Sequence, residues 1–477
     1  MTTVTAGQDT EAFRGVWRAL NALSRTATPE LAYQLAHQAI FLRSWPRPNG
    51  DGLPRSFGPV EPALRAAWTR LGLDRSMGQG APKGGQARLL CGDADRSLAV
   101  LIREVAGVEE PGGLFDACLD RYSAQLGSGG DYYTSRPLAR LMAGLAVPRT
   151  GERVLDPVCG SGRLLVAAER RAREPGSATG ALHLHGRDIR PEARRVAAMN
   201  LMLNGLCHDL GDRAIDSLCA GPTQLSADVV LANPPLNAKD WGHQELSGDS
   251  RWSLGPPPKG NANFAWVQHA LSELSSQGRA VVLLPDSATR RPNAQEWHIR
   301  RRLIERDLLA GIVALPPRFF PHTRTGTTLW LLAKDKSANP YWGRNSRVGE
   351  VLFADARWLS GRADQGGYRL VDEEIDQVCG VFASWRGAPA FQAVSDSAVK
   401  DASWWYSAST DGIARRDFDL GPGSYVRQMA VDSGVSVPEE APERPVNELY
   451  ECFDHAVTIS RQLRHVLGAE SMGRADT

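Results

Sequence analysis

The chain has 477 residues, of which 42 % are hydrophobic and 23 % charged, close to the usage of ordinary globular proteins. This composition excludes a disordered chain and a collagen-like repeat, and seven dispersed cysteines without a CxxC pair argue against a disulfide framework or a zinc site. The formal net charge of +1 means that any site for a polyanion must be a local basic surface. There is no signal-like leader and no run of about 18 apolar residues, so we expect a cytoplasmic protein without a membrane span.

Residues 1–128 predict a helical N-terminal domain. Thr28-Pro29-Glu30 is typical of a helix start, because a capping hydroxyl precedes a proline at the first helical position. The residues that follow repeat an apolar face at helical spacing, namely Leu31, Leu35, Ala39 and Leu42. Glycine-rich sequence just before residue 131 closes this domain.

Residues 129–336 predict an α/β domain with a doubly wound, Rossmann-like sheet. Short apolar runs ending in Asp, Asn or Gly alternate here with helix-like stretches, which favours a parallel sheet covered on both faces. Ligands of such sheets bind beyond the carboxyl ends of the strands, where these polar residues lie.

Residues 337–477 predict a C-terminal extension. One further strand is expected at 353–359, and the acidic, proline-rich segment 437–445 indicates a linker. A last helix follows, with an apolar seam at Leu449, Phe453, Ala456, Ser460, Leu463 and Leu467. That seam is consistent with a helix packed on its own domain or on a partner subunit.

The first chemical motif is the glycine-rich turn Asp156-Pro-Val-Cys-Gly-Ser-Gly162, between a predicted strand and a helix. Glycines let a backbone turn sharply and approach a ligand closely, but phosphate and dinucleotide sites use such turns as well. The next strand ends at Asp188, whose carboxylate could bind both hydroxyls of a ribose or could cap the helix that starts at Pro191.

The second motif is Asn233-Pro234-Pro235-Leu236, directly after the apolar run 227–232. The prolines make a rigid loop, which presents an amide oxygen and a backbone carbonyl at a strand end. Two such acceptors can hold both protons of one planar NH2 group and turn its lone pair towards an electrophile. Alone, this sequence could be a simple turn; its position two strands after the glycine-rich turn favours catalysis.

Together these motifs resemble the N6-adenine DNA methyltransferases, and specifically the modification (M) subunit of type I restriction–modification systems. Four further segments look like segments of that family: 130–142, 260–274, 299–332 and 418–426. The resemblance therefore covers most of the chain. It implies an S-adenosyl-L-methionine-dependent methyltransferase that transfers a methyl group to an adenine flipped out of DNA.

The resemblance also implies roles for single residues. The catalytic residues would be Asn233, Pro234, Pro235 and Leu236. The cofactor would be bound by Thr134, Asp156, Cys159, Gly160, Gly162, Asp188 and Asp216. Asp212 is an alternative to Asp216 near the adenine of the cofactor, and no metal is implied.

Leu236 departs from the family, which carries an aromatic residue there to stack on the flipped base. Base–aromatic stacking is worth about 1–3 kcal/mol, of which an aliphatic contact recovers only part. We therefore expect weakened or altered activity. The alternatives are a catalytically silent protein that binds DNA or a partner, and a methyltransferase that acts on RNA, a protein amide or a small molecule.

By the same resemblance, target recognition would come from a separate specificity subunit and cleavage from a separate restriction subunit. The chain has no GxxxxGK[ST] loop of the kind that nucleotide-driven motors use. A solitary enzyme that recognises its own target through residues 340–477 is the other possibility.

Overall fold

The computed structural model describes residues 13–44, 93–126, 134–174, 181–290, 293–316, 326–358, 363–364, 367–368, 371–388 and 404–426. The chain divides into two units, residues 1–426 and 427–477. The predicted linker and last helix belong to the second unit and lie outside the described residues. The boundaries predicted at residues 128 and 336 lie inside the first unit, and the three-domain division stays a prediction.

Helices make up the described part of the N-terminal region: α2 (Arg14–Thr26), α3 (Pro29–Ser44), α5 (Asp93–Ala106) and α6 (Pro111–Leu126). The predicted start of α3 is confirmed, since the Thr28 hydroxyl accepts a hydrogen bond from the backbone N–H of Leu31 at 3.3 Å. Their apolar side chains share one core, which also includes Met199 of a helix in the following domain. The four helices therefore pack against that domain as well as against one another.

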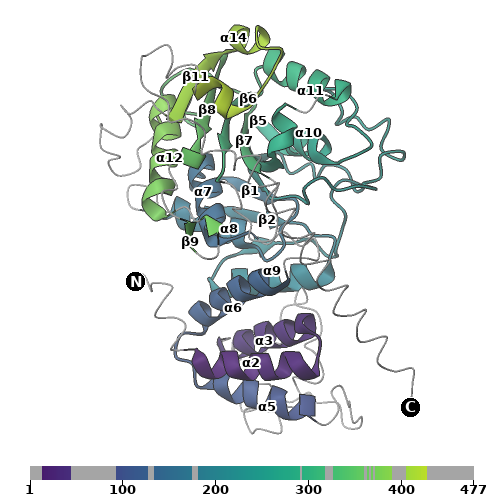
Figure 1. The fold of residues 1–477 in the computed structure, drawn as a ribbon, viewed down its shortest axis with the longest axis vertical. Coiled ribbons are helices and arrows are strands. Elements are labelled where there is room, and N and C mark those ends of the chain that lie inside the picture. Colours follow the sequence, from purple (N-terminus) through teal and green to yellow (C-terminus); the bar gives the residue numbers. More distant parts are fainter. Residues whose placement is uncertain are drawn as a thin grey trace, which may run out of the picture. The chain divides into compact units, whose positions relative to one another are not determined.

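A nine-stranded sheet forms the centre of the rest (Figure 1), in the order β11-β8-β6-β7-β5-β4-β1-β2-β3. The strands are β1 (Arg153–Asp156), β2 (His183–Gly186), β3 (His208–Asp209), β4 (Ala227–Ala232), β5 (Leu274–Pro285), β6 (Leu309–Ala314), β7 (Thr327–Ala333), β8 (Glu350–Asp355) and β11 (Trp405–Ser409). Strands β3, β2, β1, β4 and β5 pair in parallel, whereas β7 pairs antiparallel with both β5 and β6. The expectation of a parallel sheet is thus wrong for β7. Strand β11, which comes from the predicted extension, runs antiparallel to β8. Antiparallel neighbours need no helical crossover between them, unlike parallel strands.

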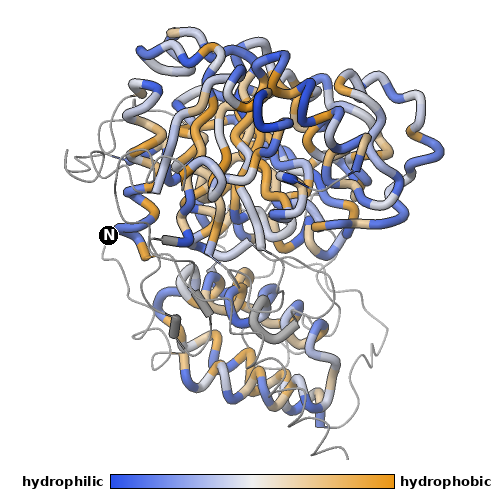
Figure 2. The backbone as a smooth tube through the Cα atoms, turned by 45° about the horizontal axis from the view of Figure 1, so that its top comes forward, coloured by the Kyte–Doolittle hydropathy of each residue, from blue (hydrophilic) through white to orange (hydrophobic). Residues whose placement is uncertain are grey.

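Both faces of this sheet are covered by helices, so the predicted doubly wound α/β fold is confirmed. One face packs on α7 (Arg136–Ala146), α8 (Arg163–Ala172), α9 (Pro191–Leu203) and α12 (Asp372–Arg386), and the other on α10 (Asn263–Glu273), α11 (Ala294–Glu305) and α14 (Thr410–Ala414). Along β4 the side chains alternate, with Val229 and Leu231 in the first core and Val230 in the second. Figure 2 shows the resulting hydrophobic centre.

The sheet continues past residue 336, because β8, β11 and α12 all come from the predicted extension. The described part of the extension also contains the strand pair β9 (Ala363–Asp364) and β10 (Gly367–Tyr368), and a short 3-10 turn, η4 (Ala356–Trp358). Another 3-10 turn, η3 (Asp286–Thr289), follows β5. Within the described ranges, no helix has the length and apolar character that crossing a membrane requires.

Candidate active site

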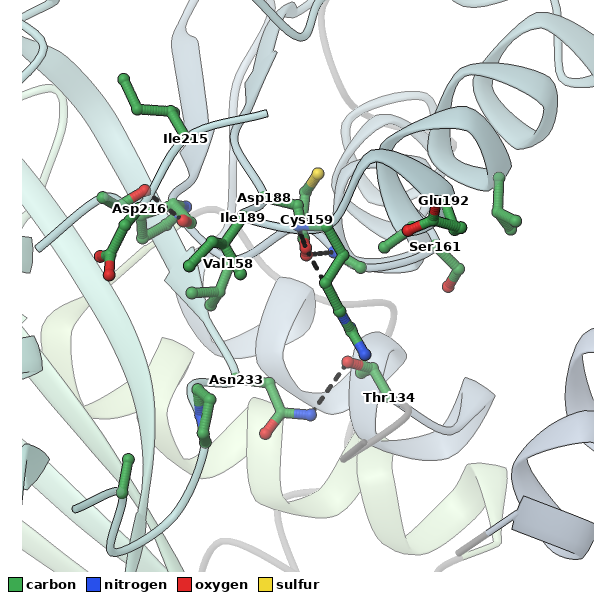
Figure 3. A pocket seen from close by; sticks show the side chains of 18 of the residues that line it. Thr134, Val158, Cys159, Ser161, Asp188, Ile189, Glu192, Ile215, Asp216 and Asn233 are labelled. Carbon is green, nitrogen blue, oxygen red and sulfur yellow. Dashed lines mark hydrogen bonds and ion pairs between the residues drawn. The ribbon is translucent and has the colours of Figure 1, made fainter. Parts of the chain in front are cut away.

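A cavity of about 530 Å³ lies where strands β1, β2 and β4 end (Figure 3). Its lining includes the turn 157–161 after β1, Asp188 after β2 and Asn233 after β4. These strands are parallel neighbours, so their carboxyl ends meet at one edge of the sheet. The two sequence motifs are thereby brought to one site, although 71 residues separate their nearest ends, Gly162 and Asn233.

The glycine-rich turn is built from backbone hydrogen bonds to two carboxylates. Asp156 is buried and accepts from the backbone N–H of Val158 at 3.0 Å, while Asp188 accepts from the N–H of Gly160 at 2.9 Å. Burial raises the pKa of Asp156 well above its ordinary value, and it also raises the pKa of the Cys159 thiol. Cys159 and Gly160 line the cavity, whereas Asp156 supports the turn from beneath without being part of the lining.

Gly162 also lies outside the cavity lining, and a different contact explains its glycine. Its φ is +74°, and an added Cβ would lie 3.3 Å from the Cα of Ala197 on α9. Close packing of the turn on α9 therefore requires glycine at this position.

For Asp188 the sequence allows two roles, binding of a ribose and capping of α9. Its second oxygen accepts from the backbone N–H of Arg190 at 2.9 Å, but the N-cap of α9 is Arg190 itself, so Asp188 is not the helix cap. The side chain is 6 % exposed and lines the cavity. One carboxylate thus ties together the ends of β1 and β2 and also faces the cavity.

Asp216 lies on the cavity wall, and Asp212 is not part of that wall. The Asp216 carboxylate accepts from the backbone N–H groups of Leu218 and Cys219, at 2.9 and 3.2 Å. The adjacent Ser217 hydroxyl donates to the carbonyl of Pro157 at 2.6 Å. These bonds fix the Asp216 segment against the glycine-rich turn, which favours Asp216 over the alternative.

The loop after β4 has an ordered carboxamide. Asn233 is buried, and its Nδ2 donates to the hydroxyl of Thr134 at 3.0 Å. Figure 3 shows the carboxamide oxygen directed away from Thr134. Pro235 is exposed and contributes to the cavity lining, whereas Pro234 does not.

Leu236 does not lie where the resemblance would put a residue that stacks on the target base. It is only 7 % exposed, it belongs to the apolar core between the sheet and α7, and it is not part of the cavity lining. The turn made by the two prolines leaves the exposed face to Pro235 and directs the next side chain inward. The presence of leucine instead of an aromatic residue at position 236 therefore affects the packing of the core more than the lining of the cavity.

The segment after this loop is held to the Asp216 segment by a buried arginine. Arg251 donates to the carbonyls of Leu218 and Ser217 at 2.5 and 3.4 Å, and it pairs with Asp249 at 2.7 Å. Its Nη1 also lies 3.1 Å from Nδ1 of His269 on α10. Burial, together with the charge of Arg251, lowers the pKa of His269 to about 3.

Several lining residues were not predicted from the sequence. Trp241 and Trp266 lie close to the Asp216 side of the cavity, in one apolar cluster with Leu218. Trp266 belongs to the segment 260–274, on which the family resemblance rests, and Trp241 lies five residues after Leu236. Their place beside these segments is the signal by which the sequence could have indicated them. Another set comes from the N-terminal helices, at Glu30, Tyr33, Gln34, His37 and Tyr122. No local motif marks these positions.

The residues present fit S-adenosylmethionine. A glycine turn allows close approach, carboxylates at the ends of two segments suit a ribose and an adenine, and tryptophans supply an apolar wall. The same cavity reaches Asn233, which is the group expected to hold the target amine.

A profile of the family described as N-6 DNA Methylase matches residues 110–433, more than half of the sequence. The chain belongs to this family. It is similar to the HindI methylase subunit of a type I restriction enzyme of Haemophilus influenzae, with 30 % identity over 75 % of this chain and 77 % of the relative. It is also similar to the MjaIX methylase subunit of Methanocaldococcus jannaschii, with 28 % identity over 75 % of this chain and 62 % of the relative.

Solved structures agree on the fold. The type I restriction–modification methyltransferase subunit of Streptococcus thermophilus has a TM-score of 0.62 at 20 % identity, over 87 % of this chain and 99 % of that one. The predicted family, the α/β methyltransferase fold, the DNA adenine-N6 methyltransferase activity and the methyl donor S-adenosylmethionine are thereby confirmed. The comparisons lend no support to the silent or non-DNA alternatives.

Proposed function

We propose that this N-6 DNA methylase acts as a modification subunit whose cavity binds S-adenosylmethionine between Asp216 and Thr134, with Asn233 as the residue that holds the target adenine. The observation that carries this proposal is the Asn233–Thr134 hydrogen bond at the rim of the cavity that Asp188 and Gly160 also line. A buried carboxamide fixed at a strand end, next to a nucleoside-sized cavity, is suited to orienting an amine.

Each binding residue has a separate task. Asp188 would accept hydrogen bonds from the ribose hydroxyls, and Asp216 would lie at the adenine end beside the tryptophan wall. Gly160, Cys159 and Thr134 would border the methionine part. Asp156 and Gly162 act indirectly, because they shape the turn on which these contacts depend.

The proposed chemistry needs no nucleophile from the protein. When bound, S-adenosylmethionine supplies a methyl group on a positively charged sulfur. The Asn233 carboxamide oxygen and the Pro234 carbonyl would accept hydrogen bonds from the two N–H groups of the adenine amine, so that its lone pair is turned out of conjugation with the ring. This is positioning together with electrostatic stabilisation, and a strong base is not required. Once N6 carries the methyl group, it is positively charged and releases one proton to water.

The partners of this subunit are part of the proposal. The adenine must leave the duplex to reach a buried carboxamide, at a cost of a few kcal/mol. Since the formal net charge of the chain is only +1, sequence-specific binding of DNA would come from a separate specificity subunit. A restriction subunit would be the third component.

Substitution of Asn233 tests the proposal. Asn233→Ala should abolish N6-methyladenine formation, measured by mass spectrometry of digested DNA after incubation with S-adenosylmethionine and the specificity subunit. Its affinity for S-adenosylmethionine, measured by calorimetry, should stay within about threefold of wild type. Turnover in this variant would remove Asn233 from the mechanism, and failure of the wild-type protein to bind S-adenosylmethionine would overturn the proposed function.

A further inference from the structure

One wall of the cavity is built by the N-terminal helices. Tyr33 and His37 on α3 and Tyr122 on α6 all line it. On the catalytic side, Glu192 and Val196 of α9 line the same part of the cavity, and Val196 packs against the N-terminal core. The N-terminal residues therefore lie at the α9 end.

This end is opposite to the one that holds Asp216. Figure 3 shows Asp216 on one side of the cavity and Ser161 and Glu192 on the other, with Asp188 between them. If Asp216 faces the adenine of S-adenosylmethionine and Asp188 its ribose, the aminoacyl group extends towards Ser161 and the wall made by α3. This step rests on the proposed function.

His37 is the polar group of that wall whose chemistry is unexplained. It is 2 % exposed, and its Nε2 has no hydrogen-bond partner among the described residues. Rings surround the imidazole, with centroid distances of 5.0 Å to Phe115, 6.2 Å to Tyr122 and 6.4 Å to Tyr33. A buried nitrogen left without a partner is unfavourable, and an apolar residue would fill the same space without that penalty.

Neighbouring contacts keep this wall in place. Arg163, at the start of α8, donates to the carbonyls of Thr134 and Asp116 at 3.2 and 3.1 Å and pairs with Asp120 of α6 at 2.6 Å. Arg163 is therefore bonded both to α6 and to the residue that orients Asn233. Burial and the charge of Arg163 lower the pKa of His37 to about 3, so the ring is neutral at physiological pH.

We propose that His37 of the N-terminal domain is part of the cofactor site, where its Nε2 hydrogen-bonds the aminoacyl group of S-adenosylmethionine. That group carries a carboxylate and an ammonium, and hydrogen bonds to charged groups are stronger than those between neutral groups. The N-terminal helices thereby become a cofactor-binding element, and cofactor binding stabilises their contact with the catalytic domain.

Two nucleosides that differ in the aminoacyl group test this assignment on the full-length protein. S-adenosylhomocysteine has the group, and 5′-methylthioadenosine lacks it. For His37→Phe, calorimetry should give about tenfold weaker binding of S-adenosylhomocysteine, with the affinity for 5′-methylthioadenosine unchanged within about twofold. His37→Gln, which keeps a polar group near the position of Nε2, should recover most of the loss.

A control variant on the same helix distinguishes a direct contact of His37 with the cofactor from a general destabilisation of α3. Ile40 is fully buried on α3 and does not line the cavity, so Ile40→Val should leave both affinities unchanged. Equal losses for both nucleosides in His37→Phe, or no loss for either, would overturn the role of His37. If the wild-type protein binds neither nucleoside, the proposed function itself fails, and that outcome is distinct from the other two.

Discussion

The side chains of Asn233 and Thr134 meet in one hydrogen bond although 99 residues separate them in the chain. The Nδ2 of Asn233 donates to the Thr134 hydroxyl at 3.0 Å, and the carboxamide oxygen is directed away from Thr134. Without this bond, the amide could rotate and exchange its oxygen for its nitrogen, and it would then present a donor to an amine that needs acceptors. Thr134 is therefore expected to act through Asn233 as a positioning residue.

Substitution of Thr134 should separate the rate of transfer from cofactor binding. Thr134→Val keeps the shape and removes the hydroxyl, so kcat should fall about tenfold or more, whereas the KM for S-adenosylmethionine should change less. Thr134→Ser retains the hydroxyl and should restore most of kcat. Steady-state methylation kinetics of the three proteins make this comparison, and equal kcat values for the valine and wild-type proteins would contradict it.

Because Leu236 is buried, we do not expect the introduction of an aromatic residue at this position to increase activity. Leu236→Phe places a larger side chain in a packed core, where overpacking typically costs about 1–3 kcal/mol. We expect a lower free energy of unfolding in urea and no gain in methylation rate. A rate gain without loss of stability would mean that the side chain reaches the target base after all.

The sequence could predict those parts of the site that lie in local motifs. Asp188, Gly160 and Asn233 each follow an apolar strand, and parallel strands bring their ends together whatever the details of the fold. The start of α3 was predictable for the same reason, because a cap depends on neighbouring residues.

Other features depend on packing that no local pattern encodes. An apolar run such as 327–333 indicates a buried strand but not its direction, so it does not predict the antiparallel insertion of β7. The inward turn of Leu236 depends on the path of the chain after two prolines, and the place of His37 in the cavity depends on a contact between domains. In each case the sequence gives the residue type, but not the direction of the strand or the orientation of the side chain.

Two glycines with similar backbone conformations separate the effect of close packing from that of backbone strain. Gly162 and Gly151 have φ of +74° and +79°, but an added Cβ would meet Ala197 at 3.3 Å in the first case and nothing within 4 Å in the second. Gly151→Ala should therefore lose about 1 kcal/mol for the left-handed conformation alone. Gly162→Ala should lose more, about 2–4 kcal/mol, and should weaken S-adenosylmethionine binding because the turn shifts. Urea unfolding and calorimetry of the pair give both values, and equal losses would show that contact with α9 is unimportant.

Stability should fall on acidification because of buried histidines. His269 is fully buried, and Nη1 of Arg251 lies 3.1 Å from its Nδ1, so a second ring proton would face a guanidinium. The pKa of about 3 in the folded state is below the ordinary 6.5 of the unfolded chain. The unfolded state therefore takes up the proton first, and the stability contributed by neutral His269 is complete above about pH 7 and decreases as the pH falls below 6.5.

The size of this effect can be isolated by substitution. Between pH 7 and pH 5, His269 should account for a loss of about 2 kcal/mol in the free energy of unfolding. His269→Gln keeps an acceptor for Arg251 but does not titrate. Between pH 7 and pH 5, the free energy of unfolding of this variant should therefore fall by about 2 kcal/mol less than that of the wild-type protein. His37, whose pKa is also lowered to about 3, titrates in the same direction and remains in this variant, so part of the wild-type dependence should persist. Urea unfolding at the two pH values measures the difference. An equal loss in the free energy of unfolding for the two proteins would mean that His269 is not held neutral by its surroundings.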